Sequence, residues 1–94
     1  MSFKNKTRAS VVAGSFYPAN PGTLKKQITG YLDRVNPENI KDIKAIVCPH
    51  AGYIYSGQVA AYSYKQVCGL DFDTVVIIAP SHSDYFDFVS VYDG

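Results

Sequence analysis

The stretch "AIVCPHAGYIYSG" at residues 45–57 decides the fold, because an apolar run ends there at Pro-His and a helix-forming segment follows it. Its apolar residues are contiguous rather than alternating, which is typical of a strand buried on both faces of a parallel sheet. A second apolar run, "TVVIIA" at residues 74–79, is largely β-branched and ends at Pro-Ser-His. The sequence therefore predicts two short buried strands, 44–48 and 74–79, and places the two histidines of the chain, His50 and His82, just beyond their ends.

A helix over residues 21–35 is expected before the first strand. Asn20 is placed to cap it and Pro21 to occupy its first position, as helix starts commonly show. Asn36 and Pro37 end it, because proline disfavours helical geometry in the residue before it. One face of this helix carries the apolar residues Leu24, Ile28, Tyr31, Leu32 and Val35.

A second helix, residues 56–68, is predicted between the two strands. Ser56 is the expected N-cap, and Gly69 is expected to end the helix in a left-handed conformation. The inner face of the helix is predicted to carry Ala60, Tyr64 and Val67.

A strand, a helix and a strand at this spacing predict a right-handed βαβ unit with parallel strands, in an α/β fold whose sheet is covered by helices on both faces. Residues 87–92, "DFVSVY", alternate in character and predict a third strand or its beginning. So few strands cannot cover their own edges and faces. We therefore expect residues 1–94 to form a single partial α/β domain, the N-terminal part of a larger three-layer α/β domain.

Composition limits the classes of partner. The net charge is +1, so no bulk field favours nucleic acid or an anionic membrane. Residues 71–94 contain aspartates but no lysine or arginine. These aspartates are expected either to be solvated at strand ends or to form a face that attracts cations.

The start of the chain lacks an apolar core of signal-peptide length, and no apolar run approaches the ~20 residues that span a bilayer. Cys48 and Cys68 are too far apart for a CxxC motif, and reduced thiols are expected, with Cys48 in the core. These features favour a cytoplasmic protein.

The two histidines predict a metal site. Ligands of α/β sheets bind beyond the carboxyl ends of the strands, and neighbouring strand ends lie close enough for two imidazoles to reach one ion. Each histidine could instead only cap its loop through a hydrogen bond. Two imidazoles do not complete a zinc or iron site. Asp84, Asp87 or residues beyond 94 are the candidates for the missing ligand.

The loop "GYIYSG" supplies further candidates. Gly52 and Gly57 bracket it, and the start of the following helix is either an anion site or an ordinary connection. Tyr53 and Tyr55 are candidates to line the pocket. Ser56 and Ser81 lack a nucleophile-elbow motif, which disfavours hydrolysis by a Ser-His pair.

Three motifs together resemble the N-terminal portion of the Memo family over residues 8–94. They lie within "RASVVAGSFYPANPGTL", "CPHAGYIYSGQVAAYSY" and "VVIIAPSH". The resemblance implies an α/β fold like that of class III extradiol dioxygenases, which use non-haem iron. It makes His50 and His82 metal ligands, for iron first and for copper or zinc as alternatives. It places Phe16 and Tyr17 at the pocket, and Gly52, Tyr53 and Ser81 are assigned to the same pocket.

Two functions follow as expectations. The first is a metal-dependent, dioxygenase-like oxidoreductase that acts on a small molecule. The alternative is a non-catalytic module that binds a peptide or phosphopeptide in the same cleft. The resemblance also implies a functional association with a radical-SAM protein, because microbial genes of this family often lie beside one. The later metal ligand of the family has no counterpart in these residues.

Overall fold

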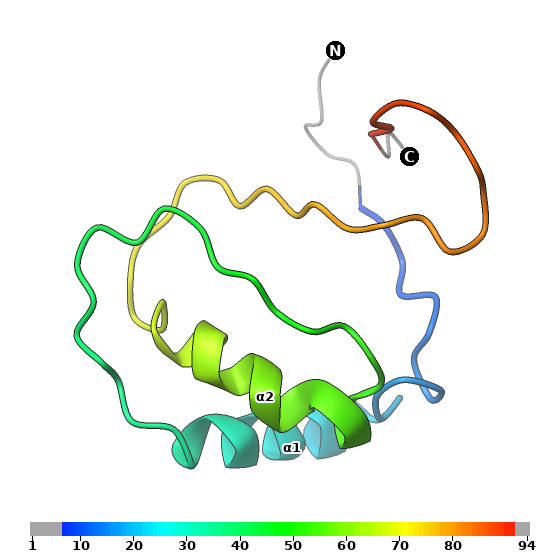
Figure 1. Ribbon diagram of the computed structural model, residues 1–94. Coiled ribbons are helices and arrows are strands. Elements are labelled where there is room, and N and C mark those ends of the chain that lie inside the picture. Colours follow the sequence, from blue (N-terminus) through cyan, green and yellow to red (C-terminus); the bar gives the residue numbers. More distant parts are fainter. Residues whose placement is uncertain (1–6, 92–94) are drawn as a thin grey trace. The chain divides into compact units, whose positions relative to one another are not determined.

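The computed structural model describes residues 7–91, with helix α1 at Pro21–Asp33 and helix α2 at Tyr53–Lys65 (Figure 1). The chain divides into two compact units, one formed by residues 10–70 and the other by the segments on either side of them. Each unit is described by itself. Both helices belong to the unit of residues 10–70.

Helix α1 begins where the sequence predicts. The side chain of Asn20 accepts a hydrogen bond from the amide of Thr23 at 3.0 Å, and Pro21 occupies the first turn. The helix ends at Asp33, two residues earlier than predicted. The amides of Arg34 and Val35 both donate to the carbonyl of Leu32, so the chain tightens and leaves the helix before it reaches Pro37. Val35 lies beyond the helix and is buried, with 4% of its surface exposed.

Helix α2 begins at Tyr53 and not after Ser56, so the predicted N-cap is wrong. Gly52 is the N-cap, and the amide of Tyr53 donates to the carbonyl of Phe16 at 2.8 Å. A partner distant in sequence therefore fixes the first residue of the helix. The hydroxyl of Ser56 lies one turn inside, where it donates to the carbonyl of Ala51 at 3.2 Å.

The other end of α2 also differs from the prediction. The helix ends at Lys65, and residues 66–69 form turns in which amides bond to the third residue before them. Gly69 does adopt the predicted left-handed conformation, with φ of +82°. Gly69 is the last residue of these turns, so it does not directly follow the helix as predicted.

The two helices pack together at a glycine. A Cβ atom added to Gly57 would lie 2.6 Å from Cε2 of Tyr31, so only glycine admits the Tyr31 ring at this distance. The hydroxyl of Tyr31 donates to the carbonyl of Tyr53 at 3.0 Å, and the side chain of Gln58 donates to the carbonyl of Tyr31 at 2.9 Å. Two hydrogen bonds and one close approach therefore fix α1 against α2.

The predicted inner face of α2 is wrong in its register. Ala61 is the buried residue of the helix, with 4% exposed, while Tyr64 is 53% exposed. Gly57 and Ala61 lie four residues apart and share the face toward α1. Small residues at both positions let the helices approach, which the apolar pattern alone did not indicate.

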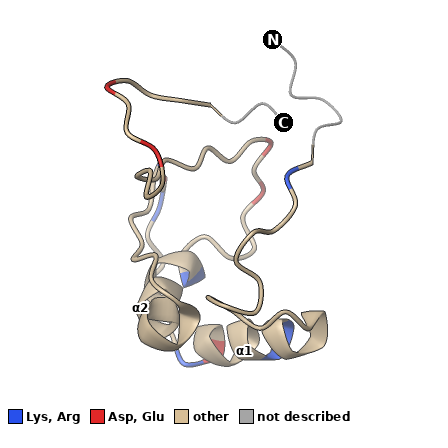
Figure 2. Ribbon diagram, turned by 90° about the vertical axis from the view of Figure 1, so that its right-hand side faces the viewer, with Lys and Arg blue, Asp and Glu red and all other residues tan. Residues whose placement is uncertain are grey.

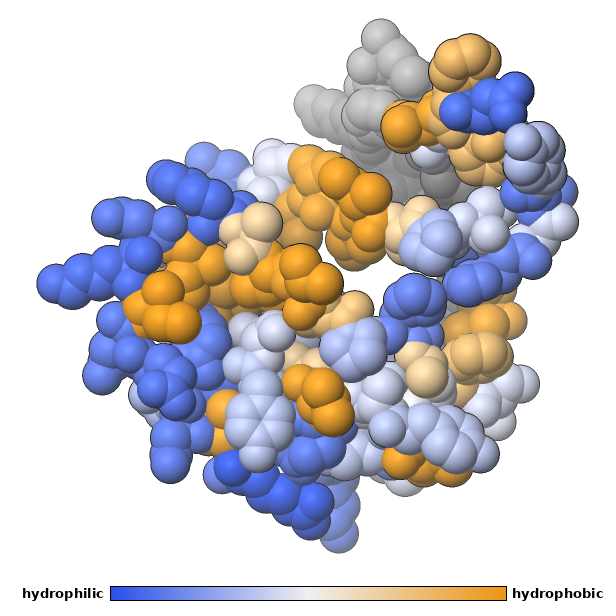
Figure 3. Space-filling view, in the orientation of Figure 1, coloured by the Kyte–Doolittle hydropathy of each residue, from blue (hydrophilic) through white to orange (hydrophobic). Residues whose placement is uncertain are grey.

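The structure assigns no strand to residues 7–91, apart from an isolated bridge between Ala13 and Tyr17. The segments 44–48 and 74–79 are irregular, and their apolar side chains are largely exposed, including Val47 and Ile78 at 90% each. Apolar side chains accordingly appear at the surface in Figure 3. A strand exists only when a neighbour pairs with its backbone, so the parallel sheet stays a prediction. The third predicted strand is likewise unassigned as far as residue 91, and its last residue, Tyr92, lies outside the described residues.

Substitution of the two glycines of the helix pair should have opposite effects. Gly57→Ala should destabilise the chain by about 1–3 kcal/mol, because the added methyl group overlaps the Tyr31 ring. Gly30→Ala is the matched control, since nothing lies within 4 Å of a Cβ at this helical position, and it should stabilise by ~0.5–1 kcal/mol. Urea unfolding followed by far-ultraviolet circular dichroism measures both. Equal effects of the two substitutions would contradict the packing.

Candidate functional site

A tight turn at residues 13–17 forms one side of the candidate site. The amide of Gly14 donates to the carbonyl of Tyr17 at 2.7 Å, and Gly14 has a φ of +88° that side-chain-bearing residues rarely adopt. The amides of Ser15 and Phe16 both donate to the carbonyl of Val12 at 3.0 Å. The turn thereby fixes the backbone of Phe16 and Tyr17.

This turn is joined to the start of α2. Besides the hydrogen bond from the Tyr53 amide to the Phe16 carbonyl, the rings of Tyr17 and Tyr53 lie 5.3 Å apart, tilted by 41°. Aromatic pairs favour such separations. The backbone of Phe16 also passes close to Gly52, where an added Cβ would lie 3.6 Å from its carbonyl oxygen. Two segments far apart in sequence therefore build one surface.

Between the turn and α2 lies a cavity of about 290 Å³, which we call the aromatic hollow. Four of the five predicted pocket residues line it: Phe16, Tyr17, Gly52 and Tyr53. Tyr55, a further candidate, lines it too, and Gln27 reaches it from α1. Ser81, the fifth, belongs to the other unit. The structure thus brings four predicted residues around one cavity, and their role in binding stays a prediction.

The aromatic hollow is uncharged among the described residues that line it. Lys25 and Lys26 directly precede Gln27 on α1, and Lys65 is the first charged residue of α2 (Figure 2). Farther along α2, burial raises the pKa of the Tyr64 phenol above its ordinary value, and Cys48 and Tyr53 raise this pKa further. Tyr64 does not line the hollow, so this shift describes the far part of α2 and not the hollow.

Some of the amides at the start of α2 are already paired. The amide of Tyr53 donates to Phe16, and the amides of Tyr55 and Ser56 both donate to the carbonyl of Gly52. The Ser56 amide makes the ordinary first bond of the helix, so two of the four amides that a helix start leaves unpaired, those of Tyr53 and Tyr55, are paired with protein carbonyls. The anion site and the ordinary connection that the sequence left open both stay predictions.

The two histidines lie in different units. His50 is exposed and precedes α2 by three residues, in a loop tied down by the bond from Ser56 to Ala51. His82 is exposed in the segment 71–91, beside a local turn in which Ser81 accepts from the amide of Asp84 at 3.1 Å. Their convergence on one ion stays a prediction.

A third ligand does not emerge from residues 7–91. Among them, no group of three or more His, Cys, Asp and Glu side chains is placed to hold a metal ion. The carboxylate of Asp87 accepts a hydrogen bond from the Tyr85 hydroxyl at 3.1 Å. Two imidazoles fit a transition metal in ligand type, and further ligands are needed to complete its shell.

The serines and cysteines singled out in the sequence make local contacts within the fold. Ser56 and Ser81 are both engaged in the local hydrogen bonds described above. Both cysteines are free thiols, Cys48 half-buried and Cys68 exposed. Cys68 donates through sulfur to the carbonyl of Tyr64 at 3.4 Å. Nothing in this geometry activates either residue type as a nucleophile.

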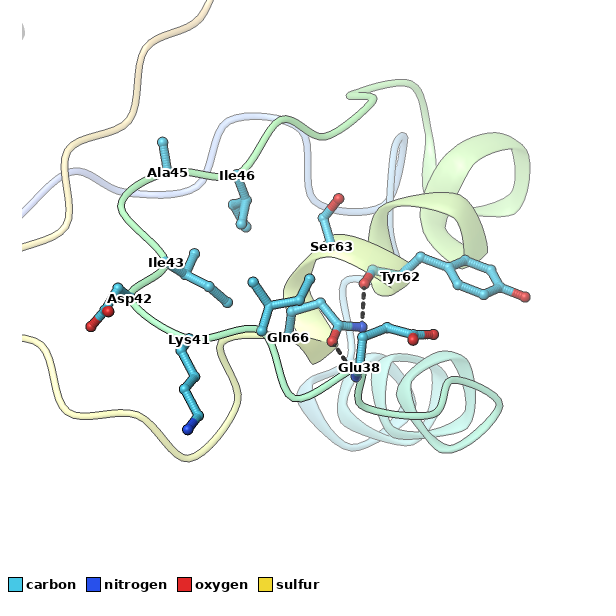
Figure 4. Close-up of a pocket in the computed structure, with 10 residues that line it drawn as sticks. Glu38, Lys41, Asp42, Ile43, Ala45, Ile46, Tyr62, Ser63 and Gln66 are labelled. Carbon is cyan, nitrogen blue, oxygen red and sulfur yellow. Dashed lines mark hydrogen bonds between the residues drawn. The ribbon is translucent and has the colours of Figure 1, made fainter.

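A second cavity, of about 520 Å³, lies between the loop at residues 38–46 and the last turns of α2 (Figure 4). Gln66 lies beside it and pairs with the amide of Glu38 at 2.7 Å and the carbonyl of Tyr62 at 3.0 Å. The apolar side chains of Ile43 and Ile46 point toward α2. No predicted site residue lines this cavity.

Gln27 and Tyr31 are the residues that sequence reasoning missed. Tyr31 was assigned only to the apolar face of α1, although its hydroxyl holds the first residue of α2. Gln27 lies four residues before Tyr31, on the same face of the helix. A polar residue on an otherwise apolar helical face is the signal that could have identified it.

Comparison with known proteins gives one family. The profile described as Memo-like protein matches residues 8–94. The chain is 44% identical to the protein memo-1 homolog of Caenorhabditis elegans over 85% of its own length and 23% of that relative. It is 42% identical to a MEMO1 family protein of Methanocaldococcus jannaschii (96% of the chain, 35% of the relative) and 40% identical to one of Methanosarcina barkeri (89% and 31%).

The chain thus spans about a quarter to a third of the length of these relatives. No solved structure is significantly similar to it. Within residues 7–91, neither helix has the length and apolar character needed to cross a membrane.

Removal of the Tyr31 hydroxyl should loosen the candidate site. Tyr31→Phe leaves the carbonyl of Tyr53 without its donor and should cost ~0.5–1.5 kcal/mol of stability. It should also speed hydrogen exchange at the Tyr53 amide, which bonds to Phe16. Tyr62→Phe is the control, because Tyr62 is 57% exposed. If both substitutions left the exchange of Tyr53 unchanged, Tyr31 would not hold the start of α2.

Proposed function

Because this chain belongs to the Memo-like protein family, we propose that it supplies two histidine ligands, His50 and His82, to a metal site of a dioxygenase-like oxidoreductase. The observation that carries the proposal is the equivalent position of the two histidines in the sequence. Each follows a proline after an apolar segment, in "AIVCPH" and "VVIIAPSH". In a parallel sheet, both would emerge at the same edge.

The surroundings of His50 support this role. The bonds from Ser56 to Ala51 and from Tyr53 to Phe16 fix the backbone on its carboxyl side. Pro49 restricts the backbone on the other side. A ligand held by rigid neighbours loses little conformational entropy when it binds an ion.

Iron is the metal we propose first, with copper or zinc as alternatives, since imidazole suits all three. When bound, the ion would supply redox or Lewis-acid chemistry at open coordination positions. In this proposal, residues 7–91 contribute two imidazole ligands and the aromatic hollow, which lies beside the loop of His50. The remaining ligand is proposed to be Asp84, Asp87 or a residue beyond position 94.

The alternative function is a non-catalytic module that binds a peptide or phosphopeptide. The observation in its favour is the aromatic hollow at the start of α2, because aromatic residues and pockets are enriched where protein partners bind.

Elemental analysis and anaerobic Fe²⁺ titration test the metal site. The protein used has the length of its family relatives, because the candidate ligands include residues beyond position 94. We expect this wild-type protein to bind metal in stoichiometric amount, each of His50→Ala and His82→Ala to weaken binding, and the double variant to bind none. Asp84→Ala and Asp87→Ala measure whether either carboxylate participates. Far-ultraviolet circular dichroism should show the same helix content in every variant.

Two outcomes would overturn the metal proposal. Wild-type protein without metal would favour the binding module, and so would metal retained by the double histidine variant. Turnover of a catechol by the wild type, lost in the histidine variants, would support the oxidoreductase.

A further inference from the structure

The first turn of α2 is held in place by residues outside the helix. The amide of Tyr53 donates to the carbonyl of Phe16 at 2.8 Å, and the carbonyl of Tyr53 accepts from the hydroxyl of Tyr31 at 3.0 Å. The ring of Tyr53 also lies 5.3 Å from the ring of Tyr17. The N-cap, Gly52, has no side chain that could pair with an amide of the helix. Contacts from distant parts of the sequence therefore keep this turn helical.

The first turn buries little apolar surface of its own. Ile54 is 76% exposed and Tyr55 is 80% exposed. Most of the stability of a helix in a protein comes from the packing of its apolar face, so these two side chains do little to keep the turn wound. Unwinding would also regain the conformational entropy that an ordered backbone has lost. The turn therefore depends on the contacts of Tyr53.

A second helix start lies one turn farther along the chain. Ser56 belongs to the residue types that cap helices best, and Gly57 after it is poorly suited to a helix interior. The hydroxyl of Ser56 donates to the carbonyl of Ala51 at 3.2 Å, so its oxygen serves as a donor and not as a cap in the observed helix. A helix that began at Ser56 would keep Gly57 in its first turn, against the ring of Tyr31.

We propose that residues 53–55 form a switch with two states. In the held state, which the structure shows, Tyr53 is bound to Phe16 and Tyr31, and Gly52 is the N-cap. In the released state, residues 53–55 are unwound, and the side chain of Ser56 caps the shortened helix. The loss of the Tyr53 contacts is offset by the new cap and by the regained backbone entropy.

The switch changes two parts of the candidate site together. Tyr53, Ile54 and Tyr55 line the aromatic hollow in the held state, so release removes one wall of this cavity. Release also lengthens the loop that carries His50, because the helix then starts one turn later. The shape of the hollow and the freedom of His50 are therefore set by one equilibrium.

This inference holds whether or not His50 binds a metal, because the contacts that hold the turn involve neither histidine. It can be tested in buffer that contains a chelator. A failure of the metal proposal and a failure of this one are then separate results.

Hydrogen exchange at single amides of the full chain, followed by nuclear magnetic resonance, tests the switch. The amides of Tyr53, Tyr55 and Ser56 are paired in the held state and lose their partners on release. They should therefore exchange with one common opening constant. The amide of Ala60 stays bonded within the helix in both states, and it should exchange at least about tenfold more slowly.

Ser56→Ala should lower the common opening constant about fivefold, because it removes the cap of the released state. The substitution also removes the bond to Ala51 from the held state, and the higher helix propensity of alanine offsets this loss. Ser63→Ala is the matched control. The hydroxyl of Ser63 lies in the same helix and donates to the carbonyl of Val47 at 3.0 Å, so its removal should leave the three amides unchanged.

Tyr31→Phe should act in the opposite direction and raise the three opening constants together about fivefold, as the loss of one hydrogen bond provides. The proposal is overturned if protection rises gradually from Tyr53 to Ala60, as at an ordinary frayed helix end. It is also overturned if Ser56→Ala leaves the opening constants unchanged or raises them, or if Ser63→Ala lowers them as much.

Discussion

The contact between Tyr31 and Gly57 is the constraint on which the unit of residues 10–70 depends. Glycine admits the aromatic ring against the backbone of α2, and the hydroxyl of that ring then reaches the carbonyl of Tyr53. Because Tyr53 is the first residue of α2, the contact fixes where the helix starts and how it lies against α1. The turn at residues 13–17 also holds Tyr53, because the carbonyl of Phe16 accepts a hydrogen bond from the Tyr53 amide. The aromatic hollow is therefore a product of helix packing.

The sequence predicted the helices better at some ends than at others, and the difference has a physical cause. The start of α1 depends on Asn20 and Pro21, whose effects are local and can be recognised in any context. The start of α2 depends on Phe16, more than thirty residues away, which competes with the local capping preference of Ser56. The strands depend wholly on neighbours, because a strand has no hydrogen bonds of its own to hold it. Residues 44–48 and 74–79 have the right composition, and the structure of residues 7–91 supplies no ladder for them.

Prediction of the candidate site shows the same difference between local and long-range effects. Family resemblance placed Phe16 and Tyr17 beside the motif of Gly52 and Tyr53, and the structure gathers these residues around one cavity. Gln27 escaped notice because its place beside the cavity depends on the packing of α1 against the start of α2, which only the three-dimensional structure reveals. The pairing of His50 with His82 requires the parallel sheet, and it remains a prediction for the same reason as the sheet.

The exposed apolar segment at residues 74–79 has a consequence for the handling of this protein. A short run with high β-propensity and no charge can stack with identical runs from other molecules into cross-β fibrils. Asp73 before it and Pro80 after it act as gatekeepers, because charge and proline interrupt such stacking. While the segment is exposed, these two flanking residues oppose its association with identical segments. Their removal would promote fibril formation without altering either helix.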